Sequence, residues 1–154
     1  MLTDHERQSI EAETRLYPSP RAAVSQALKI VQDHRGWVSD ETIREIASVL
    51  GLTPSEVDST ATFYNLILRE QPGRHVIFVC DNVSCWVTGY QEIRDHLCKT
   101  LGIEPGQTTE DNRFTLLPTA CLGECDRAPA MAIDGDIHVQ LTPGKVDEIL
   151  ARYL

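Results

Sequence analysis

Apolar residues in the first half of the chain recur at the spacing of α-helices, and no segment there alternates as a strand would. Two helices are predicted, over residues 20–35 and 40–50, because their apolar residues repeat every three to four positions. The two apolar faces consist of Ala23, Ala27, Ile30 and Val31, and of Ile43, Ile46, Ala47 and Leu50. Thr53-Pro54-Ser55-Glu56 is a capping-box sequence, which predicts a third helix through about Thr60.

Capping residues set the predicted ends of these helices. Ser19 precedes a proline, which is typical of a helix start, and Gly36 is typical of a helix end. Ser39 or Asp40 can cap the second helix, and Gly51 follows its last turn. The first dozen residues are highly charged, and we expect them to form a frayed arm or another helix with a solvated acidic face.

After the turn signal Gln71-Pro72-Gly73 the pattern changes to alternating strands and helices. The predicted elements are a strand over 75–80, a helix over 89–101, a strand over 113–118, a hairpin of strands over 130–134 and 137–140, and a helix over 142–152. Asp134-Gly135-Asp136 is the hairpin signal. This order predicts a small mixed sheet with helices packed on it, which is the minimal thioredoxin-like arrangement.

The composition is that of an ordinary soluble globular protein of 154 residues, with 42% hydrophobic and 24% charged residues. The formal net charge of -9 argues against nucleic acid or an anionic membrane surface as a partner. No run approaches the roughly 20 apolar residues that a membrane helix needs, so we expect no direct membrane insertion. The charged N-terminus contains no secretory apolar segment, and we therefore expect a cytoplasmic, reducing location.

Four of the five cysteines form two pairs, and each pair directly follows a predicted strand. Cys80 and Cys85 have C-x4-C spacing, and Cys121 and Cys125 have C-x3-C spacing. Loops at strand ends can converge on one edge of a sheet, so the fold can bring the four sulfurs together. Four thiolates suit an iron–sulfur cluster or tetrahedral zinc. The spacing is wider than that of most structural zinc sites and favours a [2Fe–2S] cluster, in which each iron takes two cysteines. Cys98 lies inside a predicted helix, and we expect it to be structural.

The residues around the pairs predict the electrostatics of the site. Gly123 allows backbone N–H groups to approach a sulfur closely. The segment after Cys85 is expected to lead into a helix N-terminus, whose dipole favours negative charge. Three nearby anions are expected to lower the reduction potential of a bound cluster, with Arg127 partly offsetting them: Asp81, Glu124 and Asp126.

Several stretches of the chain, including both cysteine pairs, resemble a known family. They are PRAAVSQALKIVQDHRGWVSD, ATFYNLI, GRHVIFVCDNVSC, FTLLPTACLGECDRAPAM and IDGDIHVQLTP. Together they span about residues 18–145 and resemble the thioredoxin-like [2Fe–2S] ferredoxin family, in particular the E subunits of bacterial NADH-quinone oxidoreductase, respiratory complex I. The resemblance places the cluster ligands on Cys80, Cys85, Cys121 and Cys125.

The resemblance implies an electron-transfer subunit of the enzyme complex NADH:quinone oxidoreductase. The complex is bound to the inner membrane, and this subunit would lie in its peripheral part, outside the membrane. A flavoprotein partner would bind FMN and NADH, and the [2Fe–2S] cluster would exchange electrons with that flavin. Other subunits of the peripheral arm would be further partners. The chain contains neither G-x-G-x-x-G after a strand nor G-x-x-x-x-G-K-S/T, so the oxidation of NADH is expected to lie in the partner.

Pattern and resemblance together predict an α+β protein. Residues 1–70 are expected to form an N-terminal helical bundle, and residues 71–154 a thioredoxin-like [2Fe–2S] domain with a small mixed sheet. Because free-standing members of the family resemble the second part alone, the bundle is expected to dock a larger subunit. Trp37, Phe63 and Tyr64 either supply apolar surface for this docking or fill the bundle's own core, and a core position is favoured more for Phe63 than for Trp37.

Two alternatives remain open. The same module could be the equivalent subunit of an NAD-linked hydrogenase or formate dehydrogenase, because the cluster residues do not separate these complexes. The four cysteines could instead bind zinc in an interaction module without a redox role.

Overall fold

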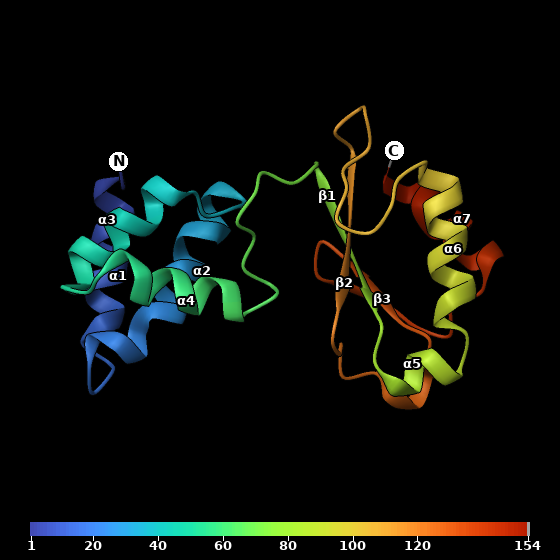
Figure 1. Ribbon diagram of the computed structural model, residues 1–154, viewed down its shortest axis with the longest axis horizontal. Helices are drawn as coiled ribbons and strands as arrows, with labels where there is room; N and C mark the ends of the chain where they lie inside the picture. The colour runs from blue at the N-terminus through green and yellow to red at the C-terminus, as the bar shows by residue number, and fades with distance from the viewer. Residues whose placement is uncertain (154) are drawn as a thin grey trace. The chain divides into compact units, whose positions relative to one another are not determined.

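The computed structural model describes residues 1–153 and divides the chain into two compact units, residues 1–71 and 72–154. The first unit consists of helices and the second combines a sheet with helices (Figure 1). The α+β fold class predicted from the sequence is confirmed.

The first unit is built of helices around one apolar core. They are α1 (Asp4–Thr14), the 3-10 turn η1 (Pro20–Ala23), α2 (Val24–Arg35), α3 (Asp40–Leu50) and α4 (Pro54–Phe63). The predicted apolar faces of α2 and α3 supply most of this core, together with Ile10 of α1 and Val57 of α4. These side chains hold the four helices in one cluster because each buries its apolar stripe against the others.

The predicted caps are present except at Ser19, whose side chain makes no capping hydrogen bond; the chain after it forms the 3-10 turn η1, and α2 begins only at Val24. The Ser39 hydroxyl accepts a hydrogen bond from the Thr42 N–H, and Thr53 forms a complete capping box with Glu56. Gly36 and Gly51 end their helices in the left-handed conformation, with φ of 83° and 67°. Helix α4 continues beyond the predicted Thr60, as far as Phe63.

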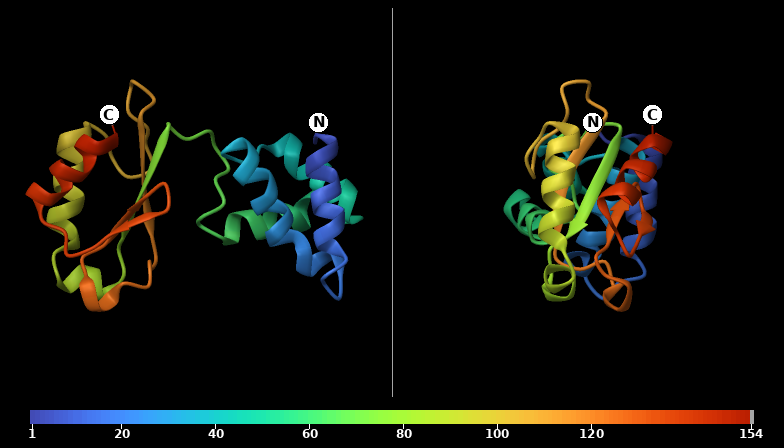
Figure 2. Two further views of the ribbon diagram at one scale, coloured as in Figure 1. Left: turned by 180° about the vertical axis from the view of Figure 1, so that it is seen from behind. Right: turned by 90° about the vertical axis from the view of Figure 1, so that its right-hand side faces the viewer.

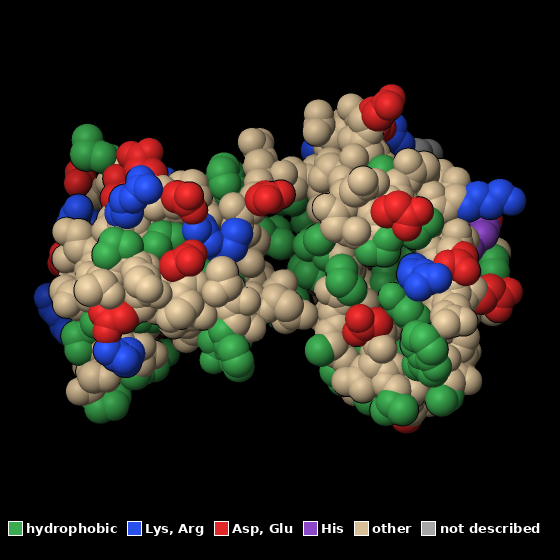
Figure 3. Space-filling model, viewed as in Figure 1, with side chains coloured by type: hydrophobic (Ala, Val, Ile, Leu, Met, Phe, Trp, Pro, Cys, Tyr) green, Lys and Arg blue, Asp and Glu red, His purple; other side chains and the backbone are tan. Residues whose placement is uncertain are grey.

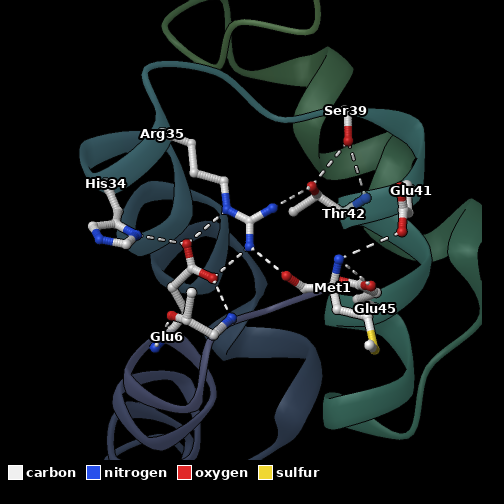
Figure 4. Close-up of polar contacts among 9 residues, drawn as sticks. Met1, Glu6, His34, Arg35, Ser39, Glu41, Thr42 and Glu45 are labelled. Atoms are coloured by element: carbon white, nitrogen blue, oxygen red, sulfur yellow. Dashed lines mark hydrogen bonds and ion pairs between the residues drawn. The ribbon is translucent and has the colours of Figure 1, made fainter.

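The charged N-terminal segment is a capped helix, and the expected solvated acidic face of this segment is wrong at Glu6. The Glu6 side chain is 0% exposed. It accepts hydrogen bonds from the Arg35 Nε at 2.7 Å and from the Thr3 N–H at 2.7 Å, and it contacts His34 Nδ1 at 2.8 Å (Figure 4). These partners hold the pKa of Glu6 far below its usual range. Glu6 is therefore a buried carboxylate that joins α1 to the end of α2.

The second unit contains a four-stranded sheet with helices on one of its faces. Its elements are β1 (His75–Cys80), α5 (Val83–Val87), α6 (Tyr90–Leu101), β2 (Phe114–Thr119), η2 (Cys125–Arg127), β3 (Met131–Ile133), β4 (Asp136–His138), α7 (Pro143–Leu150) and η3 (Ala151–Tyr153). Helices α6 and α7 lie on the same face of the sheet (Figure 2). Ile93 and Leu97 of α6, with Val146 and Ile149 of α7, pack there against Ile77 of β1.

The strand order is β2-β1-β3-β4, which gives the mixed sheet that the sequence predicts. Strand β1 pairs with β2 in parallel and with β3 antiparallel, and β4 pairs antiparallel with β3. Asp134 and Gly135, both with positive φ, form the two-residue turn of the β3–β4 hairpin. The short helix α5 has no counterpart among the predicted elements, and it carries one cysteine of the first pair.

Candidate iron–sulfur site

Parallel pairing of β1 and β2 brings the two cysteine pairs to one edge of the sheet. The two strands are in register to their last residues, so Cys80 pairs with Thr119. Cys121 follows two residues later, and the Asp81 N–H continues the ladder by donating to the Thr119 carbonyl at 3.1 Å. Because the carboxyl ends of parallel strands lie together, residues distant in sequence are delivered to one place.

The first pair is buried. Cys80 ends β1, and its N–H donates to the Ala130 carbonyl at 3.1 Å. Cys85 lies on the short helix α5 rather than in a loop, and the segment after it leads into the N-terminus of α6 at Tyr90, as expected. Asn82 caps α5 through its side-chain oxygen, which accepts from the Val83 N–H at 2.7 Å. This cap turns the chain back immediately after Cys80, and the second cysteine of the pair points inward.

Burial makes the Cys85 thiol a weak acid. Desolvation is the largest cause, and the neighbouring Cys80 thiol adds to it, raising the pKa of Cys85 to about 11. Helix α5, which carries Cys85, contacts the turn η2, which begins at Cys125, so the second pair lies close by. A metal bound at this position would have to displace the thiol proton.

The second pair is exposed and lies in a turn shaped by glycine. Cys121 and Cys125 have their sulfurs 3.9 Å apart. Gly123 has a φ of 84°, and its N–H donates to the Cys121 sulfur at 3.3 Å. The expectation that Gly123 brings a backbone N–H to a sulfur is confirmed.

The structure therefore gathers the four predicted cysteines as two pairs at one sheet edge and leaves the fifth elsewhere. Cys98 lies in α6, half-buried against the core of the second unit. Within residues 1–153, no group of three or more His, Cys, Asp or Glu side chains is placed to hold a metal ion. In the same part of the chain, no helix combines the length and the apolar character needed to cross a membrane.

Comparison with known proteins identifies the family. A model of the thioredoxin-like [2Fe–2S] ferredoxin family matches residues 10–154. The chain belongs to the thioredoxin-like [2Fe–2S] ferredoxin family. Membership implies a [2Fe–2S] cluster and a function in electron transfer.

Relatives within the family point to one enzyme complex. The E subunit of NADH-quinone oxidoreductase from Salmonella typhimurium is 56% identical over 152 residues, covering 99% of this chain and 92% of the relative. The E subunit from Escherichia coli K12 is 55% identical with the same coverage, and that from Pseudomonas aeruginosa is 49% identical over 154 residues, or 100% of this chain and 93% of the relative. The resemblance to these E subunits is confirmed, and the chain belongs to the family of NADH-quinone oxidoreductase E subunits within the ferredoxin family.

A solved structure shares the fold over most of the chain. A chain of an NAD+-reducing [NiFe]-hydrogenase, in the H2-reduced state, is 31% identical with a TM-score of 0.70. The match covers 88% of this chain and 22% of the hydrogenase chain, so this ferredoxin spans about a fifth of that chain.

The donor set of the ferredoxin domain fits a [2Fe–2S] cluster. Two pairs of thiols can give each of two irons two sulfur ligands, as the cluster requires. The short Cys121–Cys125 separation and the Gly123 N–H suit a metal-bound thiolate pair, because hydrogen bonds to ligand sulfurs stabilise the negative charge.

The carboxylates near the exposed cysteine pair of this ferredoxin differ in whether a basic side chain pairs with them. Glu124 forms an ion pair with Arg127, so the basic side chain neutralises one particular carboxylate. Asp81 and Asp126 are exposed. The expected offset by Arg127 therefore acts mainly on Glu124.

The substitution Asp126→Asn is expected to raise the reduction potential of the ferredoxin's cluster by something on the order of tens of millivolts. Removing one negative charge beside the exposed cysteines reduces the repulsion of the electron that the cluster gains, so the cluster is reduced more easily. Potentiometric titration followed by EPR measures the shift. Glu110→Gln is the matched control, since this exposed carboxylate precedes β2 at the opposite end of the strand. Equal potentials for Asp126→Asn and the wild type would show that Asp126 does not tune the site.

Helix α5 and its outward face, which includes Trp86, were not predicted from the sequence. A signal was present: Asn82 is a preferred N-cap residue and directly precedes the helix. The helix was missed because five residues are too few to show a periodic pattern.

Proposed function

We propose that Cys80, Cys85, Cys121 and Cys125 hold one [2Fe–2S] cluster, with one cysteine pair on each iron. We further propose that the chain passes single electrons to and from the FMN of a flavoprotein that oxidises NADH, within NADH:quinone oxidoreductase. The observation that carries this proposal is the parallel register of β1 and β2, which places both cysteine pairs at one edge. Relatives at 49–56% identity that are named as E subunits of this complex support it.

The protein's contribution is to hold the four thiolates in place. A bound [2Fe–2S] cluster supplies one-electron redox chemistry. The buried pair, Cys80 and Cys85, keeps water from one side of the site, and the exposed pair, Cys121 and Cys125, faces outward where electrons can enter and leave. The capped turn at Asn82 and the turn at Gly123 fix the two pairs, so electron transfer requires little rearrangement.

The hydride chemistry belongs to the partner in this proposal. The chain has neither of the two glycine-rich nucleotide-binding sequences, and the partner flavoprotein would bind both FMN and NADH. Other peripheral-arm subunits would be further neighbours, on the cytoplasmic side of the inner membrane.

The helical unit is proposed to provide a second contact with that partner. Phe63 is 79% exposed, so of the two alternatives the core position is wrong for Phe63, and Trp37 is half-buried. Phe63 and Tyr64 stack edge to face at 5.2 Å and line a hollow of about 380 Å³ with Arg21 and Ser59. Exposed aromatic pairs beside a hollow are typical of protein interfaces.

Deleting residues 1–70 is expected to leave a coloured cluster protein that binds the flavoprotein at least tenfold more weakly. The second unit keeps its own core without the bundle, so the cluster site should survive. Loss of one of two linked contacts lowers the overall affinity strongly. Copurification with the tagged flavoprotein measures this loss, and undiminished copurification would place the docking contacts elsewhere.

Coexpression with a flavoprotein subunit of NADH-quinone oxidoreductase from the same organism tests the proposed function. EPR of the complex reduced with NADH and with dithionite should show a [2Fe–2S] signal, and FMN should copurify. A complex without flavin, or a colourless protein that contains zinc, would contradict the proposal.

An NAD+-reducing hydrogenase subunit is the second candidate, because the structural match with that enzyme covers 88% of this chain. The identity of the copurifying subunits separates the two candidates, since a [NiFe] subunit would be present only in the hydrogenase.

A further inference from the structure

Helix α5 exposes an apolar face at the edge of the sheet that carries the cysteines. Three of its five residues are large and open to solvent: Val83 is 68% exposed, Trp86 54% and Val87 73%. Figure 3 shows hydrophobic side chains gathered over this helix, at the lower right of the view. Single exposed hydrophobic residues are common, but three on one short helix, one of them a tryptophan, mark an interaction surface. We refer to Val83, Trp86 and Val87 as the α5 patch.

The tryptophan of the α5 patch is held in place before any partner binds. Its ring stacks on Tyr90 with centroids 6.2 Å apart and planes 26° apart. Tyr90 is itself buried, and the Arg94 guanidinium lies over the Tyr90 ring, 5.8 Å from the ring centroid. A side chain that is already ordered loses little entropy on binding, which is characteristic of residues that dominate interfaces.

The α5 patch lies on the opposite side of the helix from a proposed cluster ligand. Cys85 is on the buried face of α5, and α5 contacts η2, the turn that begins at Cys125 (Figures 1 and 2). A protein seated on the patch would therefore approach the Cys85 sulfur to about the diameter of one helix, ~10 Å. Electron transfer between proteins slows steeply with distance, so docking at this place serves the transfer directly.

The charge around the α5 patch indicates what kind of surface fits it. Three carboxylates, Asp81, Glu124 and Asp126, lie near the patch with two basic side chains, Arg127, which pairs with Glu124, and Arg94, which pairs with Asp95. The surroundings of the patch are thus acidic, and the bound cluster would add negative charge. A complementary surface has an apolar pocket bordered by basic side chains.

We propose that the α5 patch is the docking surface for the flavin-bearing electron-transfer partner, which receives Trp86 in an apolar pocket bordered by basic residues. The proposal rests on the proposed function, since it assigns that function's partner to a surface. It differs from the ligand assignment because none of the three patch residues holds the cluster.

Calorimetric titration of the full-length, cluster-loaded chain with the purified flavoprotein subunit tests the docking surface. Trp86→Ala is expected to weaken binding at least tenfold, and binding by the wild type should weaken as salt is added. Val83→Glu is the second variant: an acidic residue is favourable in the first turn of a helix, so it should remove docking without unfolding α5. Ile137→Ala, on the edge strand β4, is the matched control and should bind within twofold of the wild type.

The visible spectrum and the EPR signal of each variant separate this proposal from the ligand assignment. Intact cluster signals with weakened binding in both variants would support the α5 patch. Intact signals with binding within twofold of the wild type in both variants would overturn it. A wild-type chain without any cluster would instead overturn the proposed function, and a cluster-loaded wild type that binds no flavoprotein would overturn the docking surface.

Discussion

Replacing Cys121 with serine and Cys125 with alanine in one variant is expected to abolish incorporation of the [2Fe–2S] cluster. The double substitution removes the exposed thiol pair, and with it both protein ligands of one iron. Because both side chains are exposed, the fold should tolerate the change. Iron content, acid-labile sulfide and visible absorbance of the protein purified without oxygen measure the loss, which should be essentially complete.

Cys98→Ser is the matched control for this loss. Cys98 is half-buried in α6 and lies outside both pairs, so its replacement should leave the iron and sulfide content unchanged. Full iron occupancy in the Cys121–Cys125 double variant would contradict the ligand assignment, and loss of the cluster in Cys98→Ser would show that the assignment is incomplete.

Arg35→Ala is expected to destabilise the helical unit by about 3–5 kcal/mol at neutral pH. Arg35 donates two hydrogen bonds to Glu6 and one to the Met1 carbonyl, so its removal leaves a buried carboxylate without its main partner (Figure 4). Urea-induced unfolding of the full-length chain, followed by far-UV circular dichroism, measures the change. Arg7→Ala, an exposed arginine on the same helix as Glu6, should stay within about 0.5 kcal/mol of the wild type.

The pH dependence of this effect follows from the lowered pKa of Glu6. A carboxylate whose pKa is lower in the folded state than in the unfolded state stabilises the fold above its unfolded pKa, near 4.5. This contribution is lost as the pH falls toward the folded-state value. The wild type should therefore lose stability below about pH 4.5. In Arg35→Ala the difference from the wild type should shrink on acidification, whereas a difference that is the same at pH 7 and pH 3 would contradict the role given to the Glu6–Arg35 pair.

The predicted elements were mostly correct because local sequence determines them. Helix ends followed the caps at Ser39 and Thr53 and the glycines at Gly36 and Gly51, which satisfy backbone groups within a few residues. The hairpin at Asp134-Gly135 was also predictable, since its two positive φ angles favour these residue types. Both cysteine pairs could be recognised from their spacing alone.

Features that depend on tertiary contacts were not predictable from the sequence. Glu6 is buried because Arg35 and His34, about 30 positions away, converge on it, and a pattern of charges along the chain does not show this. Phe63 is exposed although it follows the buried Ala61 on the same helix, because it lies at the helix's last turn, beyond the apolar stripe. Helix α5 gives no periodic signal, but it determines that Cys85 points inward and Trp86 outward.

The two cysteine pairs at the ends of β1 and β2 are proposed to hold two irons bridged by sulfide. Chemical analysis of the wild-type chain, produced anaerobically with iron supplied, tests this central claim most directly. We predict about two iron atoms and two acid-labile sulfides per chain, and a reddish-brown colour. Protein that contains no acid-labile sulfide under these conditions would contradict the assignment of a [2Fe–2S] cluster to this chain.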